Sequence, residues 1–174
     1  MRRPQRRVGL LWVLLTVTVA LAGCSQPSQP SGGTQPAATS AGPLLAFTAT
    51  TLDGESFDGM SLAGKPTVLW FWAPWCPVCL QQAPGVRAAI EQYGDKVNIV
   101  GVAGLDTTAA MPEFVRLAKV EAMTHLADEA GIVWKRFGVT AQSTFVLIDA
   151  DGTVTGKGRL DADEVPGKVG ELLS

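Results

Sequence analysis

The chain has 174 residues and a net charge of −2, so it lacks the basic footprint of a nucleic-acid-binding protein, and nucleic acid is not an expected partner. It has three cysteines, of which only two are close in sequence, and this excludes a framework of several structural disulfides. The length predicts one folded domain once an N-terminal segment is set aside.

The first 23 residues have the pattern of an export signal. Arginines at positions 2, 3, 6 and 7 precede an uncharged apolar run over residues 8–22, which is short for a membrane span and suits a signal peptide. The run ends Leu21-Ala22-Gly23-Cys24, which resembles a bacterial lipobox. The resemblance implies lipidation of Cys24 and an anchor on the extracytoplasmic face of the cell membrane. The alternative is an ordinary signal peptide or signal anchor that happens to contain a cysteine.

A tether is expected over residues 24–42. Residues 25–42 are rich in Ser, Gly, Pro, Gln and Ala and have no aromatic or branched aliphatic side chain, so they cannot build a core. The folded domain is therefore expected over residues 43–174. Export would place its cysteines outside the reducing cytosol.

Apolar patterning alternates strands with helices along this domain. The expected strands cover residues 47–52, 56–57, 67–73, 97–103, 125–126, 144–149 and 154–157, and the expected helices cover 79–93, 107–120, 130–137 and 163–173. The near-continuous apolar run at 67–73 is typical of a central parallel strand buried on both faces. Pro84 is expected to kink its helix, and Pro166 and Gly167 to weaken the last one. The order predicts an α/β fold, a mixed sheet with helices on both faces.

Two cysteines follow the apolar strand where the first helix begins, in the stretch Trp72-Ala73-Pro74-Trp75-Cys76-Pro77-Val78-Cys79. Unpaired N–H groups and the dipole of the helix's first turn stabilise a thiolate at Cys76. Cys79 lies one turn further on, within reach to close a disulfide, so the pattern predicts a redox pair. A structural zinc site normally needs four ligands, and with two cysteines and the single histidine, His125, it is poorly supported.

This motif resembles that of thioredoxin-fold thiol–disulfide oxidoreductases. The W-A-x-W-C-x-x-C form, with Gly64-Lys65-Pro66 before the strand and Pro84 after the cysteines, is similar to the exported group, closest to actinobacterial DsbE/DsbF-like lipoproteins. The resemblance implies a thioredoxin-like fold and no cofactor. It implies a partly exposed attacking Cys76 and a buried resolving Cys79, which exchange with substrate through a mixed disulfide. The implied potential-tuning residues are Pro77 and Val78, and the implied substrate-contacting residues are Trp75, Gln142, Ser143 and Thr144.

Three positions depart from the family pattern. Ser143 stands where the family places a cis-proline before the last central strand. A cis bond to a non-proline residue costs about 3–4 kcal/mol, against about 0.5–1 kcal/mol for proline, so a trans or a strained Gln142–Ser143 bond is expected. Trp70 occupies the place of a buried acid, and Gln82 the place of a glutamate frequent in the reductase branch. Both changes remove a candidate proton acceptor for Cys79.

The leading hypothesis is an exported enzyme that forms disulfides in unfolded or reduced exported proteins and is served by an unidentified redox partner. The expected extracytoplasmic location favours oxidation over reduction, and so does Gln82 in place of the glutamate of the reductase branch. One alternative is a thiol reductase of the cytochrome c maturation type. Another is a copper-handling thioredoxin-fold protein, because copper(I) suits thiolates and Ser143 would no longer shield them. His125 is expected to be structural, with assistance to proton transfer as the alternative.

Overall fold

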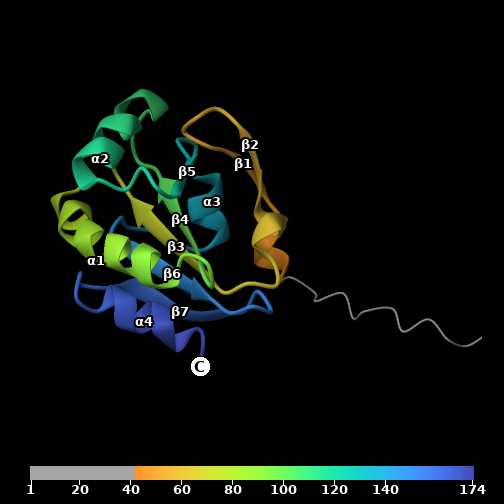
Figure 1. Cartoon of the computed structure of the whole chain (residues 1–174). Coiled ribbons are helices and arrows are strands. Elements are labelled where there is room, and N and C mark those ends of the chain that lie inside the picture. The colour runs from red at the N-terminus through yellow and green to blue at the C-terminus, as the bar shows by residue number, and fades with distance from the viewer. Residues whose placement is uncertain (1–41) are drawn as a thin grey trace, which may run out of the picture. The chain divides into compact units, whose positions relative to one another are not determined.

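The computed structural model describes residues 42–174. The predicted signal peptide, the lipidation site Cys24 and the tether as far as residue 41 lie outside the described residues. Residues 42–174 form a mixed α/β fold around a five-stranded sheet (Figure 1). The predicted fold class is therefore confirmed at the level of α/β architecture, with a mixed sheet and helices on both faces.

The central sheet has the strand order β5-β4-β3-β6-β7. Strand β3 is parallel to β4, which is parallel to β5, whereas β6 runs antiparallel to both β3 and β7. The strands are β3 (Thr67–Trp72), β4 (Asn98–Ala103), β5 (Thr124–Ala127), β6 (Thr144–Ile148) and β7 (Val154–Arg159). A separate hairpin precedes them, made of β1 (Thr48–Thr50) and β2 (Ser56–Asp58).

Four α-helices connect or follow these strands. They are α1 (Pro77–Tyr93), α2 (Met111–Ala118), α3 (Ile132–Arg136) and α4 (Val165–Glu171). Short 3-10 turns occur as η1 (Pro43–Leu45), η2 (Gly59–Leu62) and η3 (Thr108–Ala110). Within residues 42–174, no helix is both long and apolar enough to span a membrane.

Strand β3 is the middle strand of the sheet, and all six of its residues are buried. Side chains alternate along a strand, so Val68, Trp70 and Trp72 enter one core, while Leu69 and Phe71 enter the other. Helices α1, α2 and α4 cover the first face, and α3 with the β1–β2 hairpin covers the second (Figure 1). Each large apolar side chain buried in this way contributes about 1.5–3 kcal/mol. The two cores fix β3, and with it the place where α1 begins.

Pro166 acts differently from the sequence-based expectation, and the kink expected at Pro84 stays a prediction. Helix α1 begins at Pro77 and continues through Pro84 to Tyr93 as one element. In α4, Pro166 lies in the first turn, where a missing N–H removes no helical hydrogen bond, so it starts the helix rather than weakening it. The helix expected over 107–120 is shorter, because its start is the 3-10 turn η3 and it ends where Lys119 adopts a left-handed conformation.

Candidate active site

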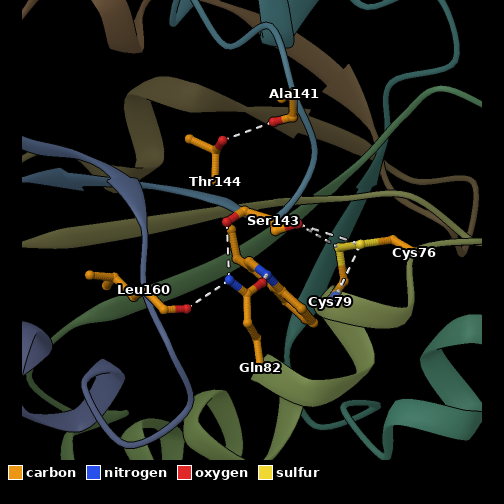
Figure 2. The surroundings of a disulfide bond; sticks show 8 residues. Cys76, Cys79, Gln82, Ala141, Ser143, Thr144 and Leu160 are labelled. Atoms are coloured by element: carbon orange, nitrogen blue, oxygen red, sulfur yellow. Dashed lines mark hydrogen bonds between the residues drawn. A yellow bond between two sulfur atoms is a disulfide. The ribbon is translucent and has the colours of Figure 1, made fainter.

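The two cysteines form a disulfide at the N-terminus of α1, just beyond the end of β3 (Figure 2). Cys76 is the N-cap residue, and its Sγ accepts a hydrogen bond from the backbone N–H of Cys79 at 3.0 Å. Pro77 fills the first helical position, where it has no N–H to leave unpaired. The sulfur of Cys76 therefore lies at the positive end of a 17-residue helix dipole.

Cys76 is less accessible than the family resemblance implies. It is 2% exposed in the disulfide, so the expectation of a partly exposed Cys76 is wrong for this form; Cys79 is 0% exposed, as expected. Cys76 packs within the core cluster that also holds Trp72 and Ala73, and Ser143 covers its sulfur. Little of the Cys76 surface is therefore accessible to a substrate thiol in this form.

Ser143 faces the disulfide from the loop before β6. The described residues contain no cis peptide bond, so Gln142–Ser143 is trans, and Ser143 has a left-handed φ of 64°. Its Oγ lies 3.6 Å from Cys76 Sγ and 3.8 Å from Cys79 Sγ (Figure 2). Ser143 is buried, whereas the neighbouring Gln142 and Thr144 are half-buried. The hydroxyl of Thr144 points away from the sulfurs and donates to the Ala141 carbonyl at 2.8 Å (Figure 2).

The uncharged side chain of Gln82 is buried beside Ser143, where all of its hydrogen-bonding groups have partners. Its Oε1 accepts from the Trp70 indole N–H at 3.0 Å, and its Nε2 donates to the carbonyls of Ser143 at 3.0 Å and Leu160 at 2.7 Å. The sequence shows that Gln82 and Trp70 each stand where the family pattern has an acid, but it does not show that the two side chains bond to each other. The signal that could have paired them is their joint departure from the family pattern. The Gln82 amide stands where the reductase branch has a glutamate. It forms three hydrogen bonds and cannot accept a proton from Cys79.

An exposed apolar pair lies beside the cysteines. Trp75 is 54% exposed, and its indole N–H donates to the Leu105 carbonyl at 3.3 Å. Leu105 is itself 51% exposed and has a left-handed φ of 62°. No sequence motif points to Leu105, because its position depends on the turn after β4. Trp72, by contrast, is fully buried and stacks on Phe114 with ring centroids 4.2 Å apart.

His125 is a buried residue of β5. Its Nε2–H donates to the Val120 carbonyl at 3.0 Å, and its ring packs edge-on against Trp72. Burial lowers the pKa of His125, and the Val120 carbonyl and the more distant carboxylates of Asp53 and Glu121 only partly offset this effect. The imidazole is therefore neutral at pH 7. Within residues 42–174, no three or more His, Cys, Asp and Glu side chains gather as a set of metal ligands.

A disulfide capping the helix that follows a central β-strand defines the class of thiol–disulfide oxidoreductases. The model of the AhpC/TSA family matches residues 42–157, and the chain belongs to this thioredoxin-like family. The enzyme is a thiol–disulfide oxidoreductase with Cys76 and Cys79 as its redox pair, and its predicted thioredoxin-like fold is confirmed.

Relatives from Mycobacterium tuberculosis support this assignment. The soluble secreted antigen MPT53 is 42% identical over 143 residues, which cover 80% of this chain and 82% of that protein. The structure of M. tuberculosis dsbF has a TM-score of 0.70 and 48% identity, covering 74% of this chain and 96% of dsbF. A secreted M. tuberculosis disulfide oxidoreductase homologous to E. coli DsbE has a TM-score of 0.68 and 41% identity, covering 75% and 99%. The similarity to DsbE/DsbF-like proteins inferred from the motif is thus confirmed.

Proposed function

We propose that this oxidoreductase works as an oxidant that forms disulfides in reduced or unfolded exported proteins. The observation that carries the proposal is the Cys76 sulfur, which accepts a backbone N–H at 3.0 Å at the positive end of α1. Donors of this kind stabilise a thiolate, and a stabilised reduced form makes a disulfide a stronger oxidant. The Gln82 amide supports the same direction, because a carboxylate in its place would repel a thiolate.

The reaction transfers two electrons from a substrate dithiol to the Cys76–Cys79 disulfide. A substrate thiolate attacks Cys76 Sγ, the S–S bond breaks, and its electron pair goes to Cys79 Sγ. The second substrate thiolate then attacks the substrate sulfur of the mixed disulfide and expels Cys76 as a thiolate. The substrate leaves with a new disulfide, and a thiol-oxidising partner must reoxidise the enzyme. Pro77 and Val78 tune the potential by their place between the sulfurs, and Trp75, Gln142, Ser143 and Thr144 surround the incoming substrate.

Oxidative refolding of a reduced test protein tests this function. The purified enzyme is expected to accelerate refolding, and Cys76→Ser should reduce the rate to the uncatalysed value because the attacked sulfur is gone. Cys79→Ser keeps Cys76 but cannot form the disulfide, so it measures any acceleration of refolding that comes from the protein surface without disulfide exchange. Equal rates for Cys76→Ser and the wild type would reject the proposal. Net reduction of substrate disulfides would favour the reductase alternative instead.

The proposed site of action is the extracytoplasmic face of the cell membrane, with a lipid anchor on Cys24. The support is the lipobox-like stretch ending at Cys24, together with the secreted status in the names of two relatives. If the anchor is correct, Cys24→Ala should move the protein from the membrane fraction to the soluble fraction of cells. Retention of Cys24→Ala in the membrane fraction would reject lipid anchoring at this residue.

A further inference from the structure

The Ser143 hydroxyl has an unusual set of neighbours for a buried polar group. Within residues 42–174, its hydrogen-bonding contacts are the two sulfurs of the disulfide, at 3.6 and 3.8 Å (Figure 2). A disulfide sulfur is a weak acceptor, so this hydroxyl is poorly satisfied while the enzyme is oxidised. A thiolate is a charged acceptor, and hydrogen bonds to charged groups are about twice as strong as neutral ones. The hydroxyl therefore gains a strong partner only when the pair is reduced.

We propose that Ser143 is a catalytic residue that donates its hydroxyl hydrogen to the Cys76 thiolate of the reduced enzyme. The inference rests on the Cys76–Cys79 exchange and deepens the oxidising function proposed above. Cys76, rather than Cys79, receives this bond because its sulfur is the nearer one and already accepts the N–H of Cys79. Two donors and the end of α1 then converge on one sulfur.

The fold holds this hydroxyl in place. The Ser143 carbonyl accepts from Gln82 Nε2 at 3.0 Å, which ties the loop before β6 to helix α1. The left-handed φ of 64° turns the residue so that its side chain faces the sulfurs. A non-glycine residue pays a steric cost in this conformation. Gln82 is thus a positioning residue for Ser143, with no contact to the reacting sulfurs of its own in the described site.

The hydroxyl would act on the step in which Cys76 leaves. When the second substrate thiolate forms the substrate disulfide, the electron pair of the broken mixed disulfide goes to Cys76 Sγ. The Ser143 O–H stabilises the charge that develops there without transferring its proton. A thiol with a lower pKa leaves faster, so product release accelerates. The same bond favours the reduced enzyme and makes the disulfide more oxidising.

The test is the pH dependence of Cys76 alkylation in the reduced full-length protein. Iodoacetamide reacts with the thiolate, and peptide mass spectrometry separates modification of Cys76 from that of the other cysteines. Ser143→Ala and Ser143→Gly should each raise the Cys76 pKa by about one to two units, a tenfold or larger loss of thiolate below that pKa. An unchanged Cys76 pKa in both variants would overturn the proposal.

The two substitutions at Ser143 distinguish the effect of the lost hydroxyl from the effect of the backbone conformation. Alanine keeps the cost of a positive φ and glycine removes it, so their unfolding free energies should differ while their Cys76 pKa values agree. A pKa that shifts in Ser143→Ala but not in Ser143→Gly would assign the effect to backbone geometry and reject the hydroxyl. Thr144→Ala removes a hydroxyl from the same loop that bonds to Ala141, and it should leave the Cys76 pKa unchanged. An equal shift in Thr144→Ala would also reject the proposal.

The alkylation experiment is independent of substrate and of the direction of electron flow. A Ser143-dependent pKa in an enzyme that fails to oxidise test proteins would reject the proposed oxidising function alone. Normal oxidative refolding with an unchanged pKa in both Ser143 variants would reject the role of Ser143 alone.

Discussion

Gln82 ties helix α1 to three separate segments of the chain. It reaches Trp70 in β3, Ser143 before β6 and Leu160 after β7 from its own position in α1. Both hydrogens of the amide are donated, and its oxygen accepts the indole N–H. Each such bond contributes about 0.5–1.5 kcal/mol net, whereas an unsatisfied buried group costs about 1–3 kcal/mol. The orientation of the amide is therefore fixed by its partners.

Gln82→Glu should destabilise the protein increasingly as pH rises. A buried carboxylate facing the carbonyls of Ser143 and Leu160 cannot donate to them, so the pKa of the new acid is raised above its unfolded value of about 4.3. The stability of the variant is then fully present below about pH 4.3 and is lost as pH rises through the raised pKa. Urea unfolding at a series of pH values measures this trend. Gln81→Glu, at an exposed neighbouring position, is the matched control. Parallel pH profiles for the two variants would contradict the proposed contacts of Gln82.

The redox pair could be predicted from sequence, but its surroundings could not. The spacing of Cys76 and Cys79 on a helix N-terminus fixes their proximity by local geometry alone. The contact between Trp70 and Gln82 depends on how α1 packs against β3, which no local pattern encodes. The burial of Cys76 likewise depends on a loop distant in sequence, and for that reason the expected exposure is wrong.

At the scale of elements, helix α1 is held against the segment that leads into α4. Gly85 lies on the buried side of α1, where an added Cβ would overlap the backbone carbonyl of Ala162. Gly167 in α4 has no atom within 4 Å of the place that a Cβ would take. Both residues are glycines in helices, so sequence alone treats them alike. The packing of the two elements leaves no room for a side chain at Gly85, whereas Gly167 has room for one.

Substitutions at these two glycines should change stability in opposite directions. Gly85→Ala forces α1 away from Ala162 and is expected to cost about 1–3 kcal/mol, because a backbone carbonyl cannot move aside like a side chain. Gly167→Ala is expected to add about 0.5–1 kcal/mol, since alanine is the better helix former. Chemical denaturation with the same protocol measures both. A neutral Gly85→Ala would contradict the close approach of α1 to Ala162.

Element boundaries show where sequence patterns stop being informative. The strand expected over 67–73 agrees with β3 within one residue, because burial on both faces leaves a continuous apolar run. The helices expected over 107–120 and 130–137 are longer than α2 and α3. Their ends depend on capping, such as the Asp128 carboxylate, which accepts the backbone N–H groups of Ile132 and Trp134. Such a cap is visible only once the turn is folded.

At the scale of the whole molecule, two cores on opposite faces of one sheet fix β3, and the first of them packs α1 against that sheet. His125 sits on the α1 side of this arrangement, in the edge strand β5, against Trp72. Its neutral form is part of the packed structure, since burial lowers its pKa. The histidine therefore couples the stability of the entire domain to pH.

Acidification should destabilise the wild type through His125. The unfolded pKa is about 6.5 and the folded pKa is lower, so the unfolded state binds the proton first. The stabilising contribution is fully present above about pH 6.5 and is lost as pH falls towards the folded pKa, by up to about 1.4 kcal/mol per pH unit. His125→Gln lacks this group, so the stability difference between the wild type and the variant should shrink on acidification. A constant difference between pH 7 and 5, measured by urea unfolding, would rule out His125 as the coupled group.

The reduction potential of the Cys76–Cys79 pair tests the oxidising role most directly. Equilibration of the full-length protein in glutathione or dithiothreitol redox buffers, followed by alkylation of free thiols, gives this potential. The donors at the Cys76 sulfur predict a value clearly less negative than the thioredoxin potential of about −270 mV, displaced towards the DsbA value of about −120 mV. A potential at or below about −270 mV would contradict the oxidising role and would favour a reductase.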